Sequence, residues 1–513
     1  MLAQIYSLKI DTKIVIQERP LACSPADDPN YDDLGEIPMC LGCCARMSGN
    51  PKAKCLKCEW PICSAECEQI EHHAGNECSI FEQSQVRFTD LPAKSLIDET
   101  IFILRLCLLK SKKPSVWNDI LMKFEDHNSV RQTKKICVEK DRKVLENLKA
   151  IYDKVDDEPP FETEDVIKIS GIINVNAFSS TKLEDECSSR RMKRRVTITQ
   201  CVFPTASLLA HCCVPNACWT VSGSPNFEMT IRTTVKIPKG EMIAIAYAPR
   251  EVFVATLQRL VSTEDIAHFI CHCHRCLDAT ELNTFLGAIK CSRCKHCALL
   301  EDSESDKGYL LPKNPINPES EWQCLRCENV IPVQKVVKRL VKIEKDFESI
   351  KAMGLSRDEE ADEMEYLYKR SLDEHLHRNH YLLQEISLRI VNRQASCIYN
   401  LDAEEIERFV YHCKSILKVS DVLCPGFCRH RALIQFYMSQ VMMIEVRKRP
   451  IAALNNEEVF KIFQPIYKLQ KEAFTYFRSE DENDNRNRPT YLKGCNQYVA
   501  CLMEEMKETM QHI

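Results

Sequence analysis

A chain of 513 residues is too long to fold around one core, so we expect two to four domains. Its net charge of -5 gives no electrostatic reason to bind a polyanion over the whole surface, and no apolar run is long enough to span a bilayer. The first residues show no sustained apolar core after a basic start, so no signal peptide is expected. In a reducing compartment closely spaced cysteines are metal ligands, so the 30 cysteines predict an intracellular zinc protein.

The N-terminal residues predict a strand and a linker. Residues 9–22 alternate apolar and polar side chains until they meet a proline, which is typical of a short half-buried strand. Residues 25–38 are acidic and rich in turn formers, which indicates a linker.

The most specific spacing lies between residues 40 and 78. Three Cys pairs, separated by two or three residues, are followed by two histidines and a cysteine; the candidate ligands are Cys40, Cys43, Cys55, Cys58, Cys63, Cys67, His72 or His73, and Cys78. Zinc takes four such donors in a tetrahedron, so eight ligands make two sites, and Cys44 is left as a spare thiol.

This segment resembles a MYND zinc finger. The resemblance implies interleaved ligands, with one ion held by Cys40, Cys43, Cys63 and Cys67 and the other by Cys55, Cys58, His73 and Cys78. The family commonly has three residues between its His and the last Cys, whereas this chain has four after His73 and five after His72, so we favour His73.

Residues 89–153 carry apolar side chains at helical spacing, for example at Ile97, Ile101, Leu104 and Leu108, and predict several helices. The acidic and Pro-rich residues 156–160 interrupt them, and helix resumes near Glu162. The basic run 190–195 fits a nuclear localisation signal or an anion patch, but we favour a solvated loop. Strands are expected at residues 196–201, 229–235 and 242–247.

Three motifs then occur in a specific order along the chain: residues 210–216 (AHCCVPN), residues 240–247 (GEMIAIAY) and residues 271–276 (CHCHRC). They resemble the catalytic end of a SET domain, where Asn-His-x-Cys-x-Pro-Asn precedes a Gly-Glu strand ending in Tyr and a Cys-x-Cys-x-x-Cys tail. The resemblance implies that Tyr247 lies at the methyl-transfer end and that Phe269 stacks on adenine. It also implies that His211 holds the adenine side and that a zinc ion binds Cys213, Cys271, Cys273 and Cys276.

Asn176, in an Asn-x-Phe segment, would border the cofactor, although an ordinary helix-terminal Asn explains it equally well. Three departures predict weakened cofactor binding. The family's Gly-x-Gly loop would precede the first residues given, Ala210 stands where the family has a cofactor-contacting Asn, and Ala267 stands where it has a channel Tyr.

Two further Cys-x-x-Cys pairs predict a zinc ribbon with ligands Cys291, Cys294, Cys324 and Cys327, in which Cys297 could replace one of the first pair. Beyond it the sequence is almost continuously helix-forming, with helices expected at residues 336–350, 359–375, 381–394 and 432–446. A tetratricopeptide-like array is one interpretation, and a packing lid over the catalytic half is the other.

The order of these parts resembles the SET and MYND domain family. The expected fold is α+β: a truncated N-terminal part of SET (1–39), the MYND finger (40–78), a helical insert (79–195), the catalytic part of SET (196–250), the post-SET zinc region (251–330) and a helical C-terminal domain (331–513).

The resemblance implies a protein-lysine methyltransferase of cytoplasm and nucleus that uses S-adenosylmethionine and about four zinc ions on histone or other proteins. It also implies that the MYND finger binds proline-bearing peptides of corepressors or deacetylases. Acidic residues offset the finger's basic ones, so nucleic acid is not an expected partner, and neither is a membrane. The alternative is an inactive MYND and helical-repeat adaptor.

Overall fold

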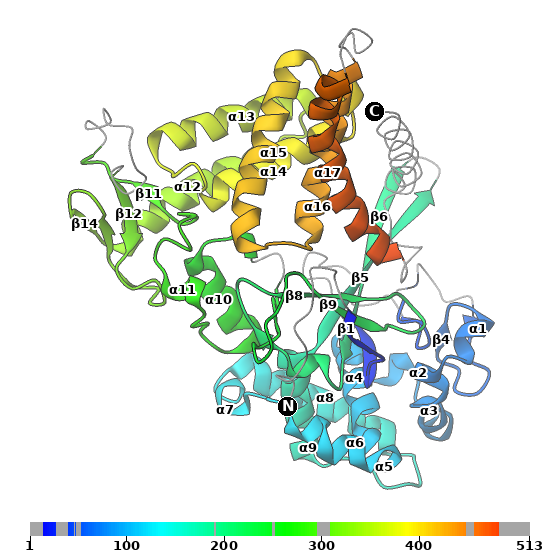
Figure 1. Ribbon diagram of the computed structural model, residues 1–513. Coiled ribbons are helices and arrows are strands. Elements are labelled where there is room, and N and C mark those ends of the chain that lie inside the picture. Colours follow the sequence, from blue (N-terminus) through cyan, green and yellow to red (C-terminus); the bar gives the residue numbers. More distant parts are fainter. Residues whose placement is uncertain are drawn as a thin grey trace.

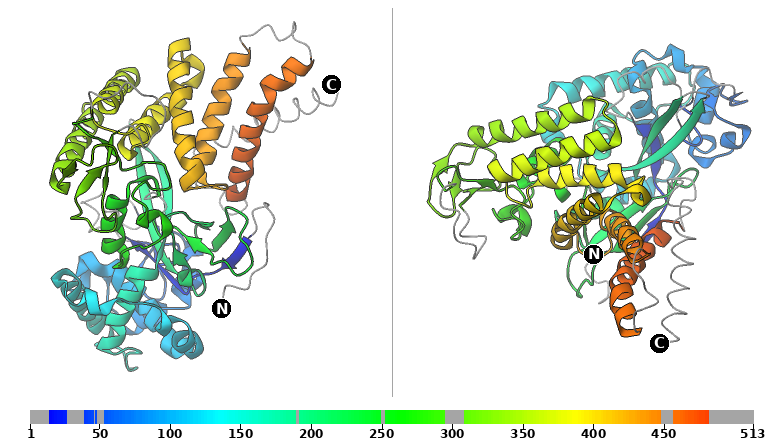
Figure 2. Two further views of the ribbon diagram at one scale, coloured as in Figure 1. Left: turned by 60° about the vertical axis from the view of Figure 1, so that its left-hand side comes forward. Right: turned by 90° about the horizontal axis from the view of Figure 1, so that it is seen from above.

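The computed structural model describes residues 14–26, 39–45, 47, 53–188, 191–248, 252–294, 308–447 and 456–481. Within them, the longer strands lie between two groups of helices, one formed before residue 177 and the other after residue 332 (Figure 1). Figure 2 shows the same separation from two other directions. A mixed α/β architecture with a helical C-terminal region is therefore confirmed.

Antiparallel strands distant in sequence build the middle layer. One sheet has the order β1 (Ile14–Glu18), β9 (Met229–Thr233), β8 (Ala217–Val221), and a second has the order β2 (Ala22–Ala26), β6 (Arg191–Val202), β5 (Phe178–Ser188). A parallel pair joins β7 (Ala210–His211) to β10 (Ala244–Ile245). Apolar side chains that include Phe203, Ile231 and Ile245 form the core of this layer.

Residues 14–26 form two strands where one was expected at residues 9–22. β1 ends at Glu18 and β2 begins at Ala22, with Pro20 between them. Proline has no N–H to donate to a ladder, so it ends the first strand. Residues 9–13, and residues 27–38 of the expected linker, lie outside the described residues, while Pro25 and Ala26 belong to β2.

The loop expected at residues 190–195 is wrong for residues 191–195, which begin strand β6; Arg190 lies outside the described residues. The register pairs Glu184 of β5 with Arg195 and Glu186 with Lys193. The basic run alone does not reveal that these residues pair with β5 in a hairpin. Helix in the insert therefore ends at Asn176, and a hairpin follows it.

Residues 53–84 form a small Cys-rich unit of the strand pair β3 (Ala53–Lys54) and β4 (Pro61–Ile62) and the helices α1 (Ala65–Glu68), α2 (Glu71–Ala74) and α3 (Cys78–Ser84). Trp60 stacks on Phe81 with ring centroids 4.1 Å apart, which supplies the unit with an aromatic core.

The insert contains α4 (Ile97–Cys107), α5 (Leu109–Lys112), α6 (Pro114–Asp119), α7 (Asn128–Arg131), α8 (Lys135–Tyr152) and α9 (Thr163–Asn176). The apolar positions expected to line one helix face, including Ile97, Ile101 and Leu104, are buried.

After β10 the chain forms α10 (Thr256–Ala267), α11 (His274–Leu277) and a four-stranded sheet of β11 (Ile289–Lys290), β12 (Tyr309–Pro312), β13 (Trp322–Cys324) and β14 (Val330–Ile331). The C-terminal helices are α12 (Val333–Ala352), α13 (Arg357–Glu374), α14 (Tyr381–Ala395), α15 (Ala403–Leu423), α16 (Arg429–Arg447) and α17 (Asn456–Asp481). Four of these helices, α12, α13, α14 and α16, match the four expected helices within a few residues. Within the described part of the chain, no helix combines the length and apolar character that crossing a bilayer requires.

Candidate metal centres and an aromatic cluster

The structure brings together four groups of Cys and His side chains, and in each group the ligand atoms lie within 4.8 Å of one another. They are the three ligand sets that the family resemblance implies and the ribbon set that the spacing predicts: Cys40, Cys43, Cys63 and Cys67; Cys55, Cys58, His73 and Cys78; Cys213, Cys271, Cys273 and Cys276; Cys291, Cys294, Cys324 and Cys327. Tetrahedral zinc with sulfur ligands separates neighbouring sulfurs by about 3.8 Å. The donor types and their spacing therefore fit zinc.

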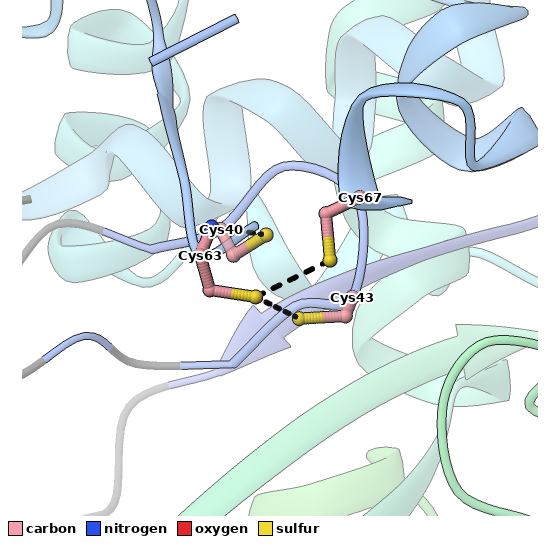
Figure 3. Close-up of side chains that lie close together, drawn as sticks. All are labelled: Cys40, Cys43, Cys63 and Cys67. Atoms are coloured by element: carbon pink, nitrogen blue, oxygen red, sulfur yellow. Dashed lines mark hydrogen bonds between the residues drawn. The ribbon is translucent and has the colours of Figure 1, made fainter. Parts of the chain in front are cut away.

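In the first group (Figure 3), the Cys63 sulfur lies 3.5 Å from that of Cys43 and 3.2 Å from that of Cys67. The turn that presents Cys40 and Cys43 needs glycine at position 42, because a Cβ there would lie 2.2 Å from the carbonyl oxygen of Cys67. Cys44 stands apart from the group, with its sulfur 3.9 Å from that of Cys23.

In the second group His73, not His72, supplies the nitrogen. Its Nε2 lies 3.5 Å from the Cys58 sulfur, whereas Nε2 of His72 lies 3.0 Å from the carbonyl oxygen of Pro225. The other ring nitrogen of His73, Nδ1, is 3.2 Å from Oε1 of Glu77. A carboxylate on the far nitrogen fixes the tautomer and ring orientation of a metal-binding His.

A buried arginine holds that carboxylate. Arg105 donates to Glu77 through Nε at 2.9 Å and Nη2 at 2.6 Å. It also donates to the carbonyl oxygens of Cys23 and Leu41, both at 2.7 Å. Arg105 thus links helix α4, strand β2 and the turn that begins the first metal group.

The third group, which we call the tail group, consists of Cys213 from the loop after β7 together with Cys271, Cys273 and Cys276. The Cys213 sulfur lies 3.5 Å from that of Cys276 and 3.9 Å from that of Cys271. Cys212 is outside the group, although its thiol also approaches Cys273. The tail of residues 271–276 is thereby brought against the stretch that follows β7.

Beside the tail group three rings, of His211, Tyr247 and Phe269, face one another. The His211 ring is 5.2 Å from that of Tyr247 and 5.8 Å from that of Phe269, and the last two are 6.3 Å apart. The pairing of β7 with β10 positions them, since Ile245 lies opposite His211 and the Tyr247 N–H donates to His211 Nδ1 at 3.2 Å.

Burial keeps the polar groups of this aromatic cluster, the rings of His211, Tyr247 and Phe269, neutral at pH 7. Burial lowers the pKa of His211 to about 4 and raises the pKa of Tyr247. The Tyr247 hydroxyl donates to the carbonyl oxygen of Leu209 at 2.8 Å. All three rings are only partly buried, so ring surface remains for a ligand.

The remaining expected cofactor residues lie near the same strands. Asn176, the last residue of α9, donates to the carbonyl oxygens of Ile172 at 2.9 Å and Glu125 at 2.7 Å. Its amide therefore closes a helix end, and its role towards a cofactor stays a prediction. Ala210 pairs with Ala244 and has no polar side-chain atom, and Ala267 is buried.

The fourth group joins the turns of the β11–β14 sheet. Sulfurs of Cys291 and Cys327 are 3.7 Å apart, and those of Cys294 and Cys324 are 3.8 Å apart. Cys297, the expected alternative, lies outside the described residues.

The sequence interpretation missed the charged residues that support two of these groups, namely Glu77, Arg105, Arg259, Arg275 and Glu281. Local signals existed for two of them, because Glu77 follows His73 by one helical turn and Arg275 lies between Cys273 and Cys276. Nothing in the sequence near Arg105 indicates its partners.

Metal-replete protein is expected to contain about four zinc ions per chain, because each group supplies four donors. Elemental analysis against protein concentration measures this. Two ions or fewer would contradict the assignment of the tail and ribbon groups.

Comparison with known proteins gives related chains and no matching family model. The chain is 25% identical over 334 residues to isoform A of the SET domain-containing protein SmydA-8 of Drosophila melanogaster, an alignment that covers 64% of this chain and 62% of that protein. It is 32% identical over 165 residues to isoform B, or 32% of each chain. It is 25% identical over 275 residues to the histone-lysine N-methyltransferase ASHR2 of Arabidopsis thaliana, or 52% of this chain and 66% of the plant protein. The chain thus spans about three fifths of the SmydA-8 isoform A that it matches.

Proposed function

We propose that this chain, a SmydA-like relative of the SET and MYND domain family, transfers a methyl group from S-adenosylmethionine to lysine side chains of proteins. The observation that carries the proposal is the convergence of His211, Tyr247 and Phe269 beside the tail group. The name of the plant relative, a histone-lysine methyltransferase, supports the same reaction class.

The residues present fit such a cofactor in part. Phe269 and the neutral His211 ring offer flat, half-buried surfaces to an adenine base. Ala210 offers no hydrogen bond where the family has an Asn, and one lost bond to a charged group costs about 1.5–3 kcal/mol. The cofactor should therefore bind roughly 10 to 100 times more weakly than with Asn at that position.

When bound, S-adenosylmethionine supplies an electrophilic methyl group on a sulfonium. The chain's own task is to orient a substrate amine and keep it neutral. The Tyr247 hydroxyl donates to the carbonyl oxygen of Leu209 and is protonated at neutral pH, as an ordinary tyrosine is, and burial raises its pKa further. Burial of a lysine ammonium beside these rings would lower its pKa, which favours the nucleophilic neutral amine.

We propose that the four metal groups bind zinc with a structural role. Each has four Cys or His donors, and a closed set of this kind is typical of structural zinc. The first two groups form the MYND-like unit, for which we propose a peptide ligand. Protein substrates and peptide partners both follow from the family relationship alone.

Titration with S-adenosylmethionine tests the function directly. We expect weak binding by the unmodified chain and an affinity at least about tenfold higher in Ala210→Asn, because the restored amide regains the lost hydrogen bond. Tyr247→Phe should bind the cofactor as the parent does and lose methyl transfer to a lysine peptide.

Isothermal titration measures both affinities, and Ala244→Ser, at the facing position of β10, is a matched control for a polar substitution. Absence of binding by both the parent and Ala210→Asn would contradict the proposal and favour an adaptor without cofactor.

A further inference from the structure

Three buried charged residues lie next to the tail group, and we call them the Arg-Glu-Arg cluster: Arg259, Arg275 and Glu281. They are 2%, 0% and 3% exposed, respectively. Oε2 of Glu281 accepts from Nη1 of Arg259 at 2.7 Å and from Nη2 of Arg275 at 2.8 Å. Its Oε1 accepts from the N–H of Thr256 at 3.0 Å. One carboxylate therefore holds two guanidinium groups in the interior.

The two arginines reach the tail group with their remaining N–H groups. Arg259 donates from Nη2 to the Cys276 sulfur at 3.3 Å, and Arg275 donates from Nη1 to the carbonyl oxygen of Cys213 at 3.2 Å. Four thiolates around a divalent ion leave an excess of negative charge, whereas the cluster has an excess of positive charge. The two charges offset each other where most of the groups involved are buried.

The turn that carries Glu281 has a strained backbone. Glu281, Leu282 and Asn283 have φ of +50°, +60° and +60°, which is the left-handed region that residues with a Cβ rarely adopt. Asp278 supports the turn by accepting from the N–H groups of Thr280 at 2.8 Å and Leu282 at 2.7 Å. Consecutive left-handed residues persist only where their surroundings fix them, and the paired arginines do so here.

The residues after this turn bond to the start of helix α14. The carbonyl oxygen of Leu286 accepts from the N–H of Tyr381 at 2.8 Å, and that of Ala288 accepts from the N–H of His377 at 3.1 Å. The carbonyl oxygen of Thr284 accepts from the Asn379 amide at 3.0 Å. The segment that begins at Glu281 therefore connects the tail group to the C-terminal helices.

We propose that Glu281 is a positioning residue that, through Arg259 and Arg275, holds the tail group in place and couples it to helix α14. Because Cys271 follows Phe269 closely and Cys213 follows His211, the same contacts fix two rings of the aromatic cluster. The consequence for cofactor binding rests on the proposed function, whereas the consequence for the tail group does not.

The test compares Glu281→Gln with Glu360→Gln in zinc-loaded full-length protein. Glu360 is a matched control, since it is 4% exposed and also pairs with two arginines, Arg389 at 2.6 Å and Arg393 at 2.9 Å, but on helices remote from the tail group in sequence. Pulse alkylation with iodoacetamide under a zinc chelator, read by peptide mass spectrometry, gives a separate rate for each cysteine.

We expect Glu281→Gln to speed alkylation of the tail group, Cys213, Cys271, Cys273 and Cys276, by about tenfold, because loss of a residue that supports metal ligands weakens metal binding by at least that factor. The alkylation rates of the other three groups should not change. Glu360→Gln should leave all four groups unchanged, and Glu281→Asp, which keeps the charge, should recover part of the protection. Equal acceleration in every group, or none in the tail group, would overturn the proposal.

If Glu281→Gln does not fold, Arg259→Lys provides the second variant. A lysine cannot donate to Glu281, Thr256 and Cys276 together as Arg259 does, so the same selective acceleration is expected. Affinity for S-adenosylmethionine should also fall about tenfold in these variants. A parent chain that binds no S-adenosylmethionine would contradict the proposed function, while the alkylation pattern would still decide the role of Glu281.

Discussion

Cys213→Ser is expected to lose one zinc ion per chain and to bind S-adenosylmethionine at least about tenfold more weakly than the parent. Cys213 is buried at the centre of the tail group, with its sulfur 3.5 Å from that of Cys276. A serine hydroxyl does not replace a thiolate ligand, so the tail is released from the stretch after β7. Phe269, two residues before Cys271, then loses its fixed position beside His211.

Cys212→Ser is the matched control, because it makes the same change at the neighbouring residue. The Cys212 sulfur accepts the N–H of Val214 at 3.4 Å and lies outside the four-ligand set, so a hydroxyl can replace it with little loss. Elemental analysis and cofactor titration of both variants measure the outcome. Equal zinc loss in both, or loss only in Cys212→Ser, would show that the ligand is misassigned.

Arg105→Met is expected to lower the free energy of unfolding by about 3–5 kcal/mol, since it leaves the Glu77 carboxylate buried without its guanidinium partner. Both side chains are essentially inaccessible to solvent, and Arg105 also donates to two backbone carbonyls from separate elements. Methionine fills the volume of the arginine stem and supplies none of these bonds. The loss should also loosen His73, which Glu77 orients.

The control for this change is Arg142→Met, in which an arginine 54% exposed pairs with Glu139 and Glu146 on the surface of α8. Exposed pairs contribute about 0–1 kcal/mol, so this variant should stay close to the parent. Urea unfolding at constant zinc concentration compares the two. A loss in Arg105→Met no larger than in Arg142→Met would contradict the view that Arg105 stabilises this junction.

The sequence predicted the metal groups more completely than it predicted the contacts around them. Ligands such as Cys55 and Cys58 lie close together in the chain, and their residue types are restricted by the metal, so spacing alone predicts them. Helix α14 was predicted almost to its ends, since its apolar positions repeat at helical spacing.

What the sequence did not predict depends on partners far along the chain. Arg105 donates to Cys23, 82 residues away, and nothing in its own neighbourhood indicates a carbonyl there. Strand β6 begins inside a basic run because of its partner strand, and a pattern read one segment at a time favours a loop. The left-handed turn at Glu281 contains no glycine, the residue whose presence would have indicated positive φ in the sequence.

The place of β1 in its sheet has a consequence for synthesis. Gln17 of β1 contacts Glu228, which is 211 residues further along the chain. Strand β2 likewise pairs with β6, which is synthesised much later. At a translation rate of about 5–20 residues per second, β1 leaves the ribosome roughly 10–40 s before its partner. Residues 40–176, with two metal groups and their helices, are complete in that interval. The segments that form β1 and β2 therefore have no partner strand while residues 40–176 fold. An unpaired strand edge can pair wrongly with another nascent chain.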